Sequence, residues 1–139
     1  MIQSIKLANY IDVYGEHWAD DLPENCPPED VCVAEGDDFY RFTQEEDTIR
    51  EDDWFNYLTL LPNNHFTEEQ KVLASGLSLV DSLDAAEKKL LLPGMKKFKG
   101  IACISLIPED GVILQTGCSV HHFTWWRTTM CDLTKAQIL

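Results

Sequence analysis

The chain has 139 residues, of which 45% are hydrophobic, and it carries a formal net charge of −13 at pH 7. This length and apolar content are typical of a single globular domain, residues 1–139, and exclude a disordered chain. The negative charge disfavours direct binding to nucleic acid or to an anionic membrane surface, because both carry charge of the same sign.

The acidic residues are concentrated in the first half of the chain. Residues 1–70 contain 18 Asp and Glu against three Lys and Arg, a net charge of −15. Residues 71–139 contain six Asp and Glu against eight Lys and Arg, a net charge of +2. A negative electrostatic field of this kind attracts basic partners, but it also keeps a protein soluble. Composition alone favours solubility as the reason for the negative charge.

Three features of the sequence predict a cytoplasmic protein. No run of about 18 apolar residues predicts a membrane-spanning helix. Residues 1–6 lack the basic stretch and long apolar run of a secretory signal. The five cysteines are odd in number and form no dense framework, which favours reduced thiols over disulfides.

The first third of the chain is predicted to hold short strands and one loop. Scattered apolar residues over 2–13 are compatible with a strand. Residues 20–30 are expected to form a loop, because three prolines remove backbone donors and five acidic residues repel one another. Strands at 31–34 and 39–42 flank a segment with turn chemistry, so they are expected to pair as a hairpin.

Short helices are predicted in the middle of the chain. In residues 54–61, large apolar side chains recur at i, i+3, i+4 and i+7, the spacing of one helix face. A Thr-x-x-Gln capping box at 67–70 opens a second helix that ends at about Ser75. A third helix begins at Asp81 or Ser82, both of which are good N-cap residues.

The C-terminal third predicts an antiparallel sheet. Apolar strands at 101–107, 112–116 and 119–127 are separated by turn residues, as in a meander. The sequence therefore predicts an α+β fold, in which a small antiparallel sheet over 101–127 packs with two or three short helices.

The most unusual local feature is the sequence HHFTWWR at 121–127. Because side chains alternate across a strand, one histidine and one tryptophan are expected together on its exposed face. Aromatic rings beside an imidazole and a guanidinium can hold a planar or anionic ligand, or can anchor a protein interface. Alternatively, the rings fill the core. The candidates are His121 and His122 for catalysis, and Trp125, Trp126 and Arg127 for binding.

Other chemistry-bearing residues give weaker signals. Arg41 is a further catalytic candidate, although an arginine in so acidic a segment is expected to form an ion pair rather than bind a substrate anion. Cys118, His121 and Cys131 could ligate zinc, but their spacing matches no standard zinc motif. No phosphate-binding loop or nucleophile motif is present, so the sequence identifies no cofactor and leaves open whether the protein is an enzyme.

Two functions are compatible with these observations. The leading hypothesis is a binding protein, such as an inhibitor, immunity or antitoxin-like protein, whose acidic surface engages a basic protein partner. The alternative is a small enzyme or ligand-binding domain whose His/Trp/Arg site takes a nucleotide or another anionic metabolite. The residues expected to contact a basic partner are Asp37, Asp38, Glu45, Glu46, Asp47 and Asp53.

Overall fold

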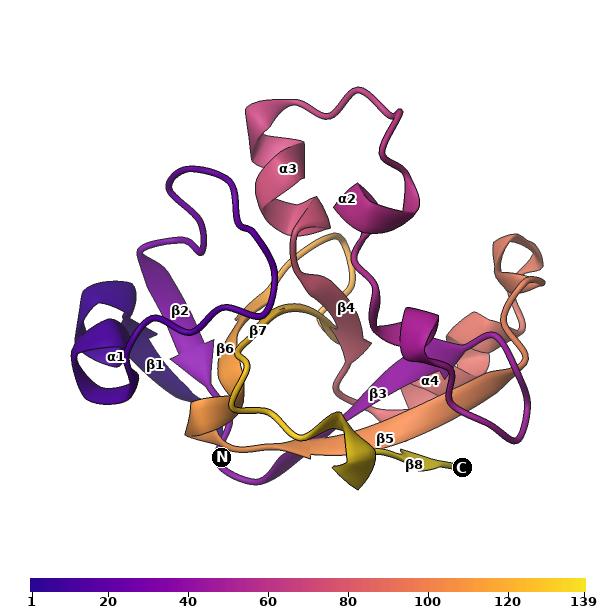
Figure 1. The fold of residues 1–139 in the computed structure, drawn as a ribbon. Coiled ribbons are helices and arrows are strands. Elements are labelled where there is room, and N and C mark those ends of the chain that lie inside the picture. Colours follow the sequence, from indigo (N-terminus) through magenta and orange to yellow (C-terminus); the bar gives the residue numbers. More distant parts are fainter.

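The fold of residues 1–139, taken from a computed structural model, is built on one curled sheet (Figure 1). Its eight strands follow the order β1-β2-β6-β7-β4-β3-β5-β8, every pairing is antiparallel, and the sheet curls into a half-barrel. The strands are β1 (Gln3–Lys6), β2 (Asp30–Val33), β3 (Asp37–Thr43), β4 (Leu77–Val80), β5 (Gly100–Leu106), β6 (Gly111–Gln115), β7 (His122–Arg127) and β8 (Gln137–Ile138).

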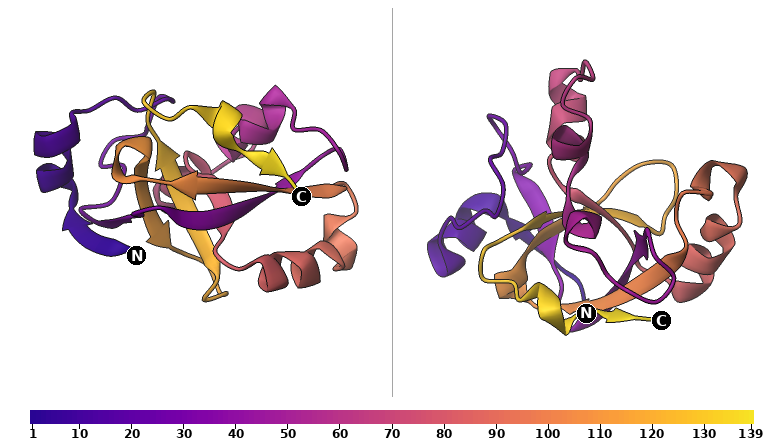
Figure 2. Two further views of the ribbon diagram at one scale, coloured as in Figure 1. Left: turned by 90° about the horizontal axis from the view of Figure 1, so that it is seen from below. Right: turned by 45° about the vertical axis from the view of Figure 1, so that its right-hand side comes forward.

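The helices are short and lie around the sheet. Figure 2 shows α3 projecting from the body of the molecule and α4 lying to one side of it. No helix combines the length and the apolar character needed to cross a bilayer. The helices are α1 (Leu7–Tyr14), α2 (Tyr57–Leu60), α3 (Glu68–Ala74) and α4 (Leu83–Leu90), with 3₁₀ turns η1 (Glu51–Trp54), η2 (Pro93–Met95), η3 (Pro108–Asp110) and η4 (Leu133–Lys135).

The predicted α+β fold, with a small sheet confined to 101–127, is wrong. Strands from the whole chain form the sheet, and β5 and β6 are not neighbours, because β5 pairs with β3 and β8 whereas β6 pairs with β2 and β7. Only the β6–β7 pairing of the expected meander forms. Turn residues specify that the chain changes direction, but they do not specify which strand becomes the neighbour.

Two local predictions are also wrong. The expected hairpin at 31–42 does not form, since β2 lies between β1 and β6 while β3 lies between β4 and β5. The expected helix over 54–61 is interrupted, because Trp54 is buried in the core and Asn56 starts a new helix by accepting a hydrogen bond from the Thr59 N–H at 2.9 Å.

Local capping signals, in contrast, are confirmed. Thr67 and Gln70 form the reciprocal capping box of α3, with bonds of 3.1 and 2.9 Å. Ser82 caps α4 by accepting a hydrogen bond from the Ala85 N–H at 3.2 Å. These bonds join groups only three residues apart, so the sequence alone determines them.

Both faces of the curled sheet are covered, and this explains why the large residues of β7 are buried. Phe123 and Trp125 pack in a core that joins β6 and β7 to β3 and β5 across the curl. Trp126 points to the opposite face, where it packs with Tyr10 of α1 and Val72 of α3. Trp125 and Trp126 are 0% and 1% exposed, so the expectation that one of them faces solvent is wrong.

Gly111 at the start of β6 is predicted to be essential for this packing. It has a φ of +133°, and a Cβ atom there would lie 2.1 Å from the Trp126 carbonyl oxygen. Gly111→Ala should lower the free energy of unfolding by about 2–4 kcal/mol, as measured by urea denaturation. Gly94→Ala is the matched control, because nothing lies within 4 Å of its added methyl group. Equal stability of the two variants would contradict this account of the β6–β7 contact.

Candidate functional site

A pocket of about 530 Å³ opens beside β3 and β4. Its walls come from segments far apart in sequence: β3, η1 and α2, β4, α4, the segment after η2, and the first residue of β7. This volume lies within the range of small-molecule sites in proteins. Two of the candidate catalytic residues, Arg41 and His122, line this pocket, whereas His121 does not.

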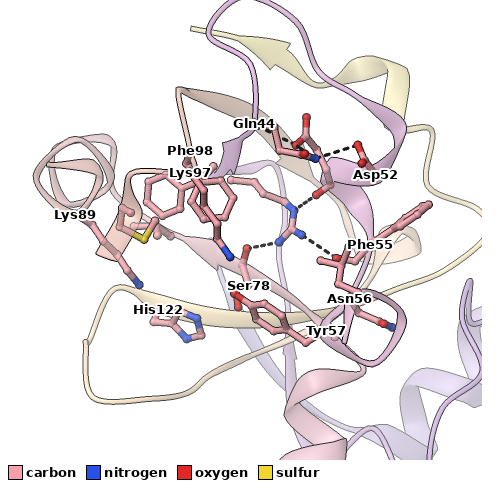
Figure 3. Close-up of a pocket in the computed structure, with 17 residues that line it drawn as sticks. Gln44, Asp52, Phe55, Asn56, Tyr57, Ser78, Lys89, Lys97, Phe98 and His122 are labelled. Carbon is pink, nitrogen blue, oxygen red and sulfur yellow. Dashed lines mark hydrogen bonds between the residues drawn. The ribbon is translucent and has the colours of Figure 1, made fainter. Parts of the chain in front are cut away.

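Arg41 holds three wall segments together. Its guanidinium donates hydrogen bonds to the main-chain carbonyl oxygens of Asp53 at 2.5 Å, Ser78 at 2.9 Å and Phe55 at 3.2 Å (Figure 3). Its Cζ atom also lies 6.0 Å from the centre of the Trp54 ring. The curl of the sheet therefore brings β3, β4 and the η1–α2 connection around one cation.

Arg41 has no carboxylate within ion-pair distance, although the charge of Asp53 stabilises it from farther away. Arg41 forms no ion pair, contrary to the expectation from the sequence, and all its hydrogen-bond acceptors are neutral carbonyls. Burial lowers the pKa of Arg41 to about 10, which still leaves it charged at neutral pH. Two of the five N–H groups of a guanidinium have no protein acceptor here. A largely enclosed cation with free N–H groups favours the binding of an anion.

The carboxylates of the pocket are engaged inside the protein. Asp53 is 5% exposed and accepts hydrogen bonds from the backbone N–H groups of Gln44 and Arg50, at 3.0 and 2.8 Å. Asp52 pairs with the Arg50 guanidinium through both its oxygens, at 3.0 and 3.1 Å. Asp53, expected to contact a partner, therefore stabilises the start of η1 instead.

The opposite side of the pocket carries positive charge. Lys89 of α4 and Lys97 after η2 both line the pocket, and neither forms an ion pair. The Lys97 ammonium lies 5.1 Å from the centre of the Phe98 ring. Figure 3 shows Lys89 and His122 on one side of the pocket, away from Gln44 and Asp52. We call Lys89, Lys97 and His122 the cationic side.

His122 is held in one tautomer. Its Nδ1 atom lies 3.1 Å from the Thr116 carbonyl oxygen, which can only accept a hydrogen bond, so Nδ1 carries the proton. The Thr116 hydroxyl also lies 3.1 Å from Nδ1 and bonds to Thr124 at 2.8 Å. Burial lowers the pKa of His122; the bond to Thr116 opposes this effect, and Lys89 adds to it.

Aromatic rings supply the apolar part of the pocket. The rings are those of Phe42 in β3, Phe55 in the η1–α2 connection, Tyr57 in α2 and Phe98 after η2. Phe55 and Tyr57 are 37% and 42% exposed, so part of each ring faces solvent. The pocket thus combines planar apolar walls with unpaired cations.

The remaining residues of 121–127 lie outside the pocket. His121 places its Nδ1 atom 2.8 Å from the Asp81 carboxylate at the surface. Arg127 has a buried Nε atom without a hydrogen-bond partner. Trp125 and Trp126 donate their indole N–H groups to internal acceptors. The structure therefore brings His122 to the pocket but not the other four candidates of this segment.

The zinc candidates do not come together. Cys118 is exposed in the β6–β7 connection, whereas Cys131 is buried in the core, where burial raises the pKa of its thiol to about 12. No group of three or more His, Cys, Asp or Glu side chains is arranged to hold a metal ion. All five cysteines are free thiols.

The acidic residues expected to contact a basic partner differ in their exposure and in whether they form ion pairs. Asp37 accepts a hydrogen bond from the N-terminal ammonium, which lowers its pKa, and Asp38 accepts one from Ser105. Glu45 lies 3.8 Å from the Arg50 guanidinium. Asp38, Glu46 and Asp47 are exposed and form no ion pair, and of these three only Glu46 and Asp47 also form no side-chain hydrogen bond.

Sequence reasoning missed several pocket residues, among them Lys89, Lys97, Gln44 and Tyr57. One signal was available for the lysines: five of the eight lysines in this acidic chain lie within 88–99. The aromatic residues gave no such signal, because their spacing equally fitted the buried face of a helix.

Comparisons with protein-family models, with curated proteins and with solved structures found no match.

Replacement of Arg41 tests its role in holding the pocket. Arg41→Met removes three hydrogen bonds from a charged donor, so it should lower the free energy of unfolding by about 2–4 kcal/mol in urea denaturation. Arg50→Met is the control, since its exposed ion pairs should contribute less than about 1 kcal/mol. A loss at Arg41 no larger than that at Arg50 would contradict the proposed role.

Proposed function

We propose that the protein binds a small anionic metabolite of the nucleotide class in this pocket. The observation that carries the proposal is the enclosed guanidinium of Arg41, which has neutral partners only. Lys89 and Lys97 add two unpaired charges of the same sign. A ligand with an anionic group would form the direct ion pairs that no carboxylate of the protein forms with these three cations.

The net charge of −13 does not oppose this function. Charges farther apart than the Debye length, about 8 Å at physiological ionic strength, are largely screened. Within about 4 Å of a cation at a protein surface, an anion gains about 4 kcal/mol at an effective dielectric constant of 20. Because Asp52 and Asp53 are already hydrogen-bonded to other groups, the charges that remain free in the pocket are positive and favour the binding of an anion.

The walls of the pocket support a planar group on the same ligand. Exposed rings such as Phe55 and Tyr57 offer surfaces on which a base can stack. Base stacking on aromatic side chains contributes about 1–3 kcal/mol per base. A nucleotide combines a planar ring with a phosphate, and so matches both parts of the pocket.

Thermal melting with adenosine monophosphate tests this function. At a concentration far above its dissociation constant, the nucleotide should raise the melting temperature by about 5–10 °C, because it binds only the folded chain. Lys97→Ala should weaken binding at least about tenfold, by loss of a charged contact. Lys96→Ala removes the same charge from the neighbouring residue, which does not line the pocket, and should bind normally.

Two results would overturn the proposal. One is a melting temperature that adenosine monophosphate leaves unchanged. The other is equal weakening by Lys97→Ala and Lys96→Ala, since this would indicate a general effect of surface charge rather than a contact in the pocket.

A basic protein partner is a second candidate function. One observation favours it: apart from the Lys71–Glu68 pair, no lysine of residues 71–139 forms an ion pair with a carboxylate of residues 1–70. The charge of the first half is therefore available to a partner, as in inhibitors and immunity or antitoxin-like proteins. Glu46 and Asp47, in the β3–η1 connection, are the contacts that we propose.

Capture experiments test this second function. The wild-type protein should capture a basic protein at low salt, and capture should fall as salt rises. Reversal of Glu46 and Asp47 to Lys should abolish capture, whereas reversal of Asp12 and Glu16, near the other end of the sheet, should not. Capture that is insensitive to salt, or equal loss in the two double variants, would exclude this surface.

A further inference from the structure

His122 offers a ligand one nitrogen atom only. Its Nδ1–H group is committed to the Thr116 carbonyl oxygen, so the free position is Nε2. The hydrogen bond to Thr116 persists whether or not Nε2 is protonated, because Nδ1 donates in both states. The ring can therefore change its charge without losing its position.

The groups around His122 oppose its protonation while the pocket is empty. Lys89 of α4 faces it across the cationic side, and Lys97 and Arg41 line the same pocket. Burial and the Lys89 charge both lower the pKa of His122. Tyr57 lines the same pocket. Asp81 follows Val80, the residue that pairs with His122, and its carboxylate is bonded to His121.

An anion that binds between Lys89 and His122 has the opposite effect and favours protonation of His122. We propose that His122 takes up a proton when the anionic end of the ligand binds next to Lys89, so that a dianion is held by both cations. This inference rests on the proposed function and specifies the ligand's charged end as a dianion, such as a terminal phosphate. The proton comes from solvent, and no covalent bond in the ligand changes.

The size of the effect follows from Coulomb's law. One negative charge about 4 Å from the imidazolium, at an effective dielectric constant of 20, raises its pKa by about three units. A shift in this direction favours the charged form of the ring near pH 7. A ligand whose charge lies at the far side of the pocket, by Gln44, would not produce this shift at His122.

Titration of the histidines by NMR tests the inference. With saturating adenosine monophosphate, the pKa of His122 should rise by more than one unit. His17, His65 and His121 serve as internal references, since none of them lines the pocket, and their pKa values should not change. His122→Gln identifies the resonance and provides a variant that cannot be protonated.

The affinity of His122→Gln gives a second readout. Because the imidazole of His122 is protonated in the complex at pH 7 but stays neutral even in the complex at pH 9, the variant should bind adenosine monophosphate about tenfold more weakly at pH 7 and equally well at pH 9. A merely structural role for His122 would weaken binding to the same extent at both pH values.

The outcomes separate this inference from the proposed function. If the nucleotide binds in a Lys97-dependent manner but the pKa of His122 is unchanged, the inference is wrong and the proposed function stands. If the pKa values of all four histidines rise together, the anion is not located at this site. If no Lys97-dependent binding occurs, both are wrong.

Discussion

The pocket depends on the hydrogen bonds of one arginine. The side chain of Arg41 extends from β3 and donates hydrogen bonds to carbonyl groups of η1, of the η1–α2 connection and of β4, so this guanidinium links the walls to one another. Carbonyl oxygens are partial charges, and they satisfy the donors without neutralising the cation. The protein thereby keeps a full positive charge within a hollow of its surface, next to aromatic rings.

The separation of charge within the pocket follows from the same architecture. Carboxylates on the η1 side are bonded to Gln44 and Arg50, whereas Lys89 and Lys97 come from α4 and the segment after η2 and have no acidic partner. An acidic protein can therefore present a locally cationic site. His122 lies on that side with one nitrogen fixed and one free, which makes it the group whose charge can respond to a ligand.

The sequence predicted contacts between near neighbours and missed those that depend on strand order. The capping residues Thr67 and Ser82 were identified correctly, because their bonds span three residues. Arg41 and His122 were selected for their chemistry, and the fold places both at one pocket. The burial of Trp126 follows from a curled sheet with two covered faces, which no local sequence pattern encodes. The predicted meander failed for the same reason.

The central claim is that an anion binds on the cationic side of the pocket that Arg41 holds together. A crystal structure of the protein grown with adenosine monophosphate tests it most directly. The account predicts phosphate density within hydrogen-bonding distance of Lys89, Lys97 or His122, with the base against the aromatic walls. Density for the nucleotide at another surface, with this pocket occupied by water alone, would contradict it.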